Sequence, residues 1–196
     1  MNTVNRNKYA RWTLGYSVAA LMLIWCAAVW AKEGVHFKRS ALHKIDAANN
    51  VYLVSAQIDY QLSPYLEQAL LNGVILNSST RMVLVKPSNW WWNQAESLST
   101  LDYELKYHAL SRHFLLTRND TNENWNYRTL TRALRKMGSV VNHRLPALPE
   151  SIHEGGYSIY LSSVVSPATL RLPLKIQSIF SSQYSMSSEV IQWPLP

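Results

Sequence analysis

Cysteine is almost absent from this chain of 196 residues, which contains only Cys26. Cys26 lies within an apolar run, so the rest of the chain has no thiol that could form a disulfide or act as a nucleophile. Acidic residues are also few, 12 against 19 Lys and Arg. The basic residues are scattered along the chain and form no stripe, which argues against nucleic acid as a partner.

Catalytic motifs are missing as well. The sequence has no GxSxG, no P-loop, no dinucleotide-binding glycine pattern, no CxxC and no HExxH. His143 and His153 fall with Glu150 and Glu154 in a predicted loop, at no recognisable metal-ligand spacing. The sequence therefore predicts a protein that is not an enzyme and that needs neither a cofactor nor a metal ion.

An apolar run from Trp12 to Ala31 is the most specific signal, because it contains no ionisable acid or base. Helical residues rise about 1.5 Å each, so this run can span the roughly 30 Å hydrocarbon core of a bilayer. Arg6, Lys8 and Arg11 precede it and no acidic residue does, which predicts a cytoplasmic N-terminus and export of everything from residue 32 onward. We expect a single-pass inner-membrane anchor, residues 12–31, and a C-terminal domain in the periplasm.

A cleaved signal peptide is the alternative reading of residues 1–31. Val29, Trp30 and Ala31 place small or tolerated residues where a signal peptidase cuts, which would release a soluble periplasmic protein. The run is longer than the apolar region of a typical signal peptide, and this favours the retained anchor.

The exported part divides into a polar, basic linker over residues 32–44 and one domain over 45–196. Alternating apolar residues predict a strand over 51–62 with Tyr52, Val54, Ala56 and Ile58 facing the core. Ser63 and Gly73 bracket a short helix. The next strand, 74–85, carries a mixed centre at 77–80 that suggests a bulge, and Pro87 ends it.

The second half of the domain continues the strand pattern. A long strand is predicted over 101–117, with a charged outer face that includes Asp102, Glu104 and Lys106, typical of a surface. A polar turn (119–126), a helix (127–137), a strand (157–165) and a last strand (184–193) follow. We therefore expect a mainly β protein, an antiparallel, Ig-like β-sandwich with two short helices behind the N-terminal membrane or signal helix.

Two groups of residues are candidates for contact with a partner. Trp90, Trp91 and Trp92 alternate between the faces of a strand, so packing in the core is the first interpretation. Contact with a protein, a membrane or a sugar is the functional alternative. Four basic residues lie outside the apolar stripe of the helix at 127–137, where either solvent or an acidic partner would explain them: Arg128, Arg132, Arg135 and Lys136.

Several segments also carry a family resemblance. The most specific are Ala69-Leu-Leu-Asn-Gly-Val74 and Tyr103-Glu-Leu-Lys-Tyr-His-Ala-Leu-Ser-Arg112. With the tryptophan run and the Leu-Pro pairs near the C-terminus, residues 45–196 resemble the uncharacterised bacterial family DUF4390. The resemblance implies a proteobacterial envelope protein with no established activity, often encoded near a nitrogen-type sensor histidine kinase.

The sequence departs from the family pattern in its C-terminal third. Family members tend to carry an arginine after the Gly-Tyr strand and a tandem Leu-Pro before the last strand. Ser162 or Ser163 and a single Leu172-Pro173 stand at those places in this chain.

Two functional hypotheses follow. The first is a membrane-anchored, non-enzymatic interaction module that contacts another membrane protein, such as a sensor kinase. The second is a signal-peptide-cleaved, soluble periplasmic protein that binds a small ligand or glycan.

Overall fold

A computed structural model describes residues 33–46, 50–86, 94–168 and 185–195. The described residues belong to one compact unit, Glu33–Pro196. The predicted membrane segment 12–31 and Trp90–Trp92 lie outside the described residues. Within those residues, no helix has the length and apolar character needed to cross a membrane.

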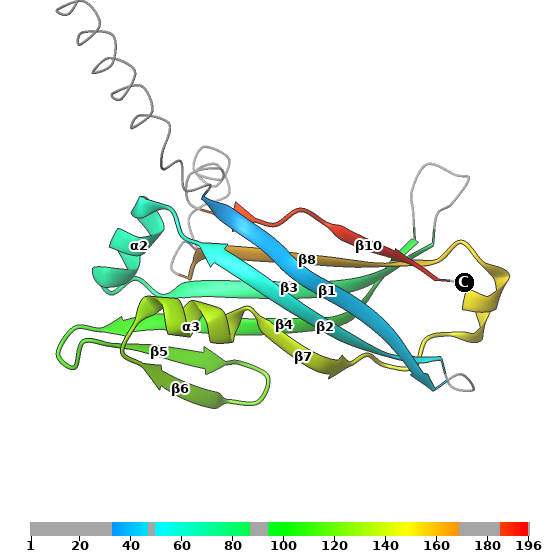
Figure 1. Cartoon of the computed structure of the whole chain (residues 1–196), viewed down its shortest axis with the longest axis horizontal. Helices are drawn as coiled ribbons and strands as arrows, with labels where there is room; N and C mark the ends of the chain where they lie inside the picture. The colour runs from blue at the N-terminus through cyan, green and yellow to red at the C-terminus, as the bar shows by residue number, and fades with distance from the viewer. Residues whose placement is uncertain (1–32, 47–49, 87–93, 169–184, 196) are drawn as a thin grey trace, which may run out of the picture. The chain divides into compact units, whose positions relative to one another are not determined.

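Strands dominate the described part of the chain (Figure 1). Its two α-helices are α2 (Pro64–Leu71) and α3 (Leu130–Met137), and Glu150–Glu154 forms a 3-10 helix, η1. The strands are β1 (Gly34–Asp46), β2 (Val51–Gln61), β3 (Leu76–Lys86), β4 (Gln94–His108), β5 (His113–Arg118), β6 (Glu123–Tyr127), β7 (Ser139–Arg144), β8 (Ser158–Pro167), β9 (Met186–Ser187) and β10 (Ile191–Pro194).

These strands form two sheets. One has three strands in the order β1-β2-β7, and the other has seven, in the order β10-β8-β3-β4-β5-β6 with β9 paired to β8. Strands pair antiparallel throughout both sheets. This arrangement fits a β-sandwich and confirms the expectation of a mainly β protein with antiparallel sheets.

The core lies between the two sheets. The three-stranded sheet contributes the face of β2 that the alternation predicted, so Tyr52, Val54, Ala56 and Ile58 are all buried. The seven-stranded sheet contributes buried residues of β3, β4, β5 and β8, among them Met82, Leu105, Leu116 and Leu161. Burying apolar side chains on one face of each sheet is what holds the sheets together.

The first predicted helix is confirmed as α2. Ser63 caps it, because its hydroxyl accepts a hydrogen bond from the Leu66 N–H at 3.3 Å, and Pro64 occupies the first turn. Asn72 follows as the C-cap, and Gly73 has a φ of 91°, which an L side chain rarely adopts. Leu66 and Leu70 are the buried residues of this helix.

The predicted linker is wrong for most of its length, because Gly34–Asp46 forms β1 and pairs with β2. A bulge between Phe37 and Arg39 shifts the register. Phe37 lies opposite Ile58 and packs against the core, whereas beyond the bulge Leu42 takes that role opposite Val54. The bulge thus breaks the period-2 pattern by which a strand is recognised in a sequence.

The predicted strand 101–117 is in fact the end of β4, a turn and β5. Arg112 in the turn has a φ of 54°. The alternation of β4 buries Leu101, Tyr103 and Leu105 as expected. After the turn, Phe114 is buried, whereas its neighbours His113 and Leu115 are only partly buried. A short turn reversed the chain and so changed which residues face the core.

Four smaller expectations also differ from the structure. The bulge of β3 lies between Met82 and Val83, not at 77–80. The polar run 119–126 overlaps strand β6, and the following helix starts at Leu130. His143 belongs to strand β7 rather than to a loop. The last predicted strand is two short ones, β9 and β10.

Candidate functional site

The outer face of the three-stranded sheet is hollowed because small side chains cover its centre. Ala41 of β1 lies opposite Ser55 of β2, and Gln57 of β2 lies between Arg39 and Ser139 in the register. The hollow has a volume of about 320 Å³ and is lined by Arg39, Ser40, Ala41, Ser55, Ala56, Gln57, Ser139, Val140 and Val141. Val141 is 72% exposed at its border.

Basic side chains lie on the same sheet and beside it, and Arg39 lines the hollow itself. Arg39 comes from β1 and Arg144 from β7, where it lies opposite Leu53 of β2. Both are exposed, as is Arg135 of α3. Within the described residues, these three arginines form no ion pair. We call the outer face of β1, β2 and β7, with these arginines and Lys38, the basic face.

Among the described residues, Lys38 is the only one of these four cations with an acidic partner. Its Nζ lies 3.1 Å from Asp59 Oδ1, and the Lys38 side chain is 61% exposed. Burial alone would raise the pKa of Asp59, but hydrogen bonds from Gln61 and Lys38 lower it below its usual value. Asp59 therefore stays ionised beside Lys38.

A second hollow, of about 510 Å³, lies between β2 and α3. The pairing of β7 with β2 begins at Ser139, opposite Gln57, and helix α3 precedes that residue in the chain. Beside the rest of β2 there is therefore a helix in place of a paired strand, and the hollow lies between the two. Gln57 lines both hollows, so they adjoin. The second is lined by Lys38, Gln57, Ile58, Asp59, Tyr60, Gln61, Thr131, Leu134 and Arg135.

Gly138 joins α3 to β7 at this point. Its carbonyl oxygen accepts a 2.8 Å hydrogen bond from the Ile58 N–H. A Cβ at position 138 would lie 2.0 Å from the Ile58 carbonyl oxygen. Glycine therefore allows the end of α3 to approach β2 closely, and this places Arg135 beside the second hollow.

The four basic residues predicted around α3 are not gathered in one patch. Arg135 lines the second hollow, whereas Arg132 is exposed elsewhere on the helix. Lys136 lies with its Nζ 4.5 Å from the centre of the Trp125 ring, a cation–π contact. Arg128 is exposed in a bend before the helix. Trp90, Trp91 and Trp92 lie outside the described residues, between the paired ends of β3 and β4.

Sequence reasoning missed Lys38, Arg39 and Arg144 as site residues. Lys38 and Arg39 were assigned to the linker, and Arg144 to a loop. The adjacent pair Lys38-Arg39 was the available signal, but only the order β1-β2-β7 brings it to the face that also carries Arg144.

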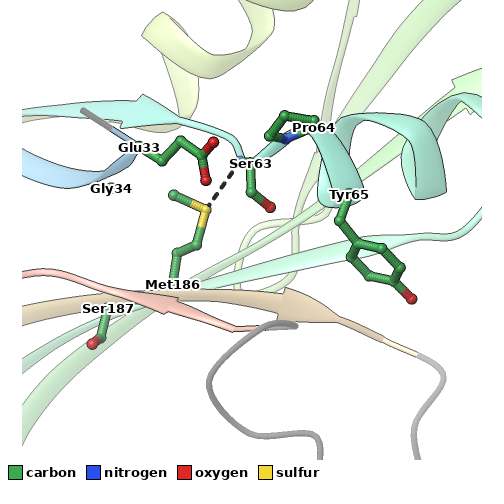
Figure 2. A pocket seen from close by; sticks show the side chains of 7 residues that line it. All are labelled: Glu33, Gly34, Ser63, Pro64, Tyr65, Met186 and Ser187. Carbon is green, nitrogen blue, oxygen red and sulfur yellow. Dashed lines mark hydrogen bonds between the residues drawn. The ribbon is translucent and has the colours of Figure 1, made fainter. Parts of the chain in front are cut away.

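A third cavity, of about 640 Å³, opens where β1 begins (Figure 2). The Ser63 N–H donates a hydrogen bond to Met186 Sδ at 3.4 Å, and the Glu33 carboxylate lies near this contact. Tyr65 points away from Met186 and is 51% exposed. The cavity offers a small molecule the carboxylate of Glu33, the phenol ring of Tyr65 and the thioether of Met186.

His143 and Ser99 connect the two sheets, with His143 Nε2 2.8 Å from Ser99 Oγ. Burial lowers the pKa of His143, and the charge of nearby Arg118 adds to this effect. Arg118 itself donates two 2.7 Å hydrogen bonds to the Asp120 carboxylate. At neutral pH the His143 ring is therefore uncharged, and the pair bridges the sheets as a neutral hydrogen bond.

Across the described ranges, no three His, Cys, Asp or Glu side chains gather as metal ligands would. Comparison with known proteins gives no match among curated proteins and none among solved structures. The profile of one family, described as "Domain of unknown function (DUF4390)", matches residues 40–194. The chain belongs to the DUF4390 family.

Proposed function

We propose that this protein is a membrane-anchored, non-enzymatic interaction module on the periplasmic side of the inner membrane. In this proposal, residues 12–31 hold it in the bilayer, and its sandwich binds another membrane protein, such as a sensor kinase. The basic face carries the proposal: it combines two adjoining hollows, an exposed Val141 and three arginines that form no ion pair with any described residue. Unpaired exposed charges around a concave, partly apolar surface are typical of binding surfaces.

The strand order supports an Ig-like module, an architecture common among interaction domains. In a variable-type Ig domain, strands A, B and E share one sheet, and G, F, C, C′ and C″ form the other. The order β1-β2-β7 corresponds to A-B-E, and β10-β8-β3-β4-β5 corresponds to G-F-C-C′-C″. We propose that β6 differs from strand D of that fold by remaining in the larger sheet, where α3 fills the space beside β2.

The partner is expected to bind the face of the three-stranded sheet rather than its edge. β1 is an edge strand, and its Lys38, Arg39 and Lys44, together with its bulge, oppose the pairing of another strand along it. The face itself carries none of these obstacles at its centre, where Ala41 and Ser55 are small.

A soluble small-ligand-binding protein, released by cleavage after Ala31, is the second candidate. The cavity beside Glu33 favours it, because its volume of about 640 Å³ falls within the range of small-molecule sites. Its lining from α2, β1 and β9 contains both polar and apolar groups.

The experiment that tests the proposal is crosslinking in cells. A photo-crosslinking amino acid is placed at Val141 on the basic face, and in a matched control at Val164, which is 38% exposed on the outer face of the seven-stranded sheet. After detergent extraction, mass spectrometry identifies the adduct and the N-terminus of the chain.

We expect a membrane protein joined at Val141 but not at Val164, on a chain that begins before Trp12. A chain that begins at Lys32 and carries no adduct at Val141 would overturn the proposal. That result would leave the soluble ligand-binding protein as the hypothesis to pursue.

A further inference from the structure

We propose that the basic face receives an extended acidic segment of a partner protein. This inference rests on the proposed function and names the chemistry of the partner. The segment would cross the hollow over Ala41 and Ser55, with carboxylates meeting Arg39 on one side and Arg144 on the other.

The basic face carries an excess of positive charge that an acidic segment would complement. The face presents Lys38, Arg39, Arg135 and Arg144, and Asp59 is the acidic residue that lines its two hollows. Because Asp59 is bonded to Lys38, the remaining three arginines have no partner among described carboxylates. Guanidinium groups bind carboxylates through paired hydrogen bonds, so an acidic chain complements this surface.

The spacing of the cations is the second argument. Arg39 and Arg144 stand on the two strands that flank β2, about 10 Å apart across the sheet. They lie opposite Gln57 and Leu53, which are about 13 Å apart along β2. An extended chain that runs obliquely over the face therefore reaches both arginines with carboxylates a few residues apart.

The shape of the face separates a peptide from an anionic lipid surface. Both sources offer negative charge, but a bilayer is broad and flat. The small residues of the hollow lie below the cations of its border, and Val141 gives that border an apolar contact. A narrow chain enters such a hollow, whereas lipid headgroups reach only its rim.

The test measures binding of a labelled peptide of alternating glutamate and serine to the full chain in an uncharged detergent, by fluorescence anisotropy at low ionic strength. The face variant combines Arg39→Glu with Arg144→Glu. The control variant combines Arg81→Glu with Lys106→Glu, two exposed cations of strands β3 and β4 in the other sheet. Circular dichroism confirms that all three proteins are folded.

We expect the glutamate peptide to bind the native chain and the control variant alike. The face variant should bind at least about tenfold more weakly, because two attractive charges become repulsive. A lysine-serine peptide should not bind the native chain, and added salt should weaken the glutamate complex.

Three results would overturn the inference. If the face variant and the control variant lose the same affinity, binding of the peptide depends on the net charge of the protein and not on the basic face. If vesicles of anionic lipid bind through Arg39 and Arg144 while the glutamate peptide does not, the face recognises a membrane. A Val141 adduct that persists without peptide binding would retain the proposed function and remove only this inference.

Discussion

Tyr60 of β2 extends across the sandwich and places its hydroxyl 2.8 Å from Ser163 Oγ of β8. The same hydroxyl lies 3.0 Å from Ser78 Oγ, and Ser163 lies 3.0 Å from Thr80 Oγ1. All four residues are buried. This polar layer explains why the mixed centre of β3 is not a bulge, since its Ser78 and Thr80 side chains face the core and bond there.

Tyr60→Phe should destabilise the domain by about 1–2 kcal/mol, because it leaves the buried Ser78 hydroxyl without a partner and removes one of the two partners of Ser163. Urea unfolding, followed by circular dichroism, measures the change. Tyr160→Phe on the outer face of β8 is the matched control and should change stability by less than about 0.5 kcal/mol. Equal effects of the two substitutions would contradict a stabilising role for the layer.

Gly138→Ala should destabilise the junction of α3 and β7. The added Cβ would lie 2.0 Å from the Ile58 carbonyl oxygen, so backbone must move. Overpacking of this kind costs about 1–3 kcal/mol. Thermal unfolding checks the loss, with Thr131→Ala on the exposed side of the same helix as control. A variant as stable as the native chain would show that α3 shifts without cost.

Stability should fall as the pH drops below about 6.5, because the pKa of His143 is lowered in the folded state. The unfolded chain binds the proton first, so acid favours unfolding until the pH passes below the folded pKa. Urea unfolding between pH 7.5 and pH 5 measures the slope. His143→Gln should flatten it in this range, and His108→Gln, at an exposed position, controls for the loss of an imidazole.

Asp59→Asn should strengthen binding of an acidic peptide to the basic face. The substitution removes the carboxylate that partners Lys38 and so frees a fourth cation. We expect an affinity about two- to fivefold higher in the anisotropy assay, in keeping with the small energies of exposed charge pairs. Asp102→Asn on the opposite sheet is the control. Weaker binding to Asp59→Asn would show that Asp59 positions Lys38 for the ligand.

Several elements of the fold could be predicted because their signals are local. The alternation of β2 identified its buried face, Ser63 and Gly73 marked the limits of α2, and the apolar stripe of the helix predicted at 127–137 contains Ala133 and Met137, the buried residues of α3. Each of these signals lies within a few consecutive residues, where backbone preference and burial act together.

The candidate site could be predicted only in part. The sequence singled out Arg135 and Lys136 together, whereas the structure separates them: Arg135 lines the second hollow and Lys136 lies over Trp125. Which side of a short helix meets a sheet depends on the neighbouring strands. Local pattern alone could not make that distinction.

By itself, the sequence determined the β-rich class, the two short helices, the family and the apolar run at residues 12–31. Only the tertiary structure decided that β1 is a strand and that Arg39 and Arg144 share a face. The physical reason is that a bulge hides the period of β1, and pairing between distant strands leaves no local trace in the sequence. The basic face is therefore a product of strand order, assembled from residues that composition shows only as scattered charges.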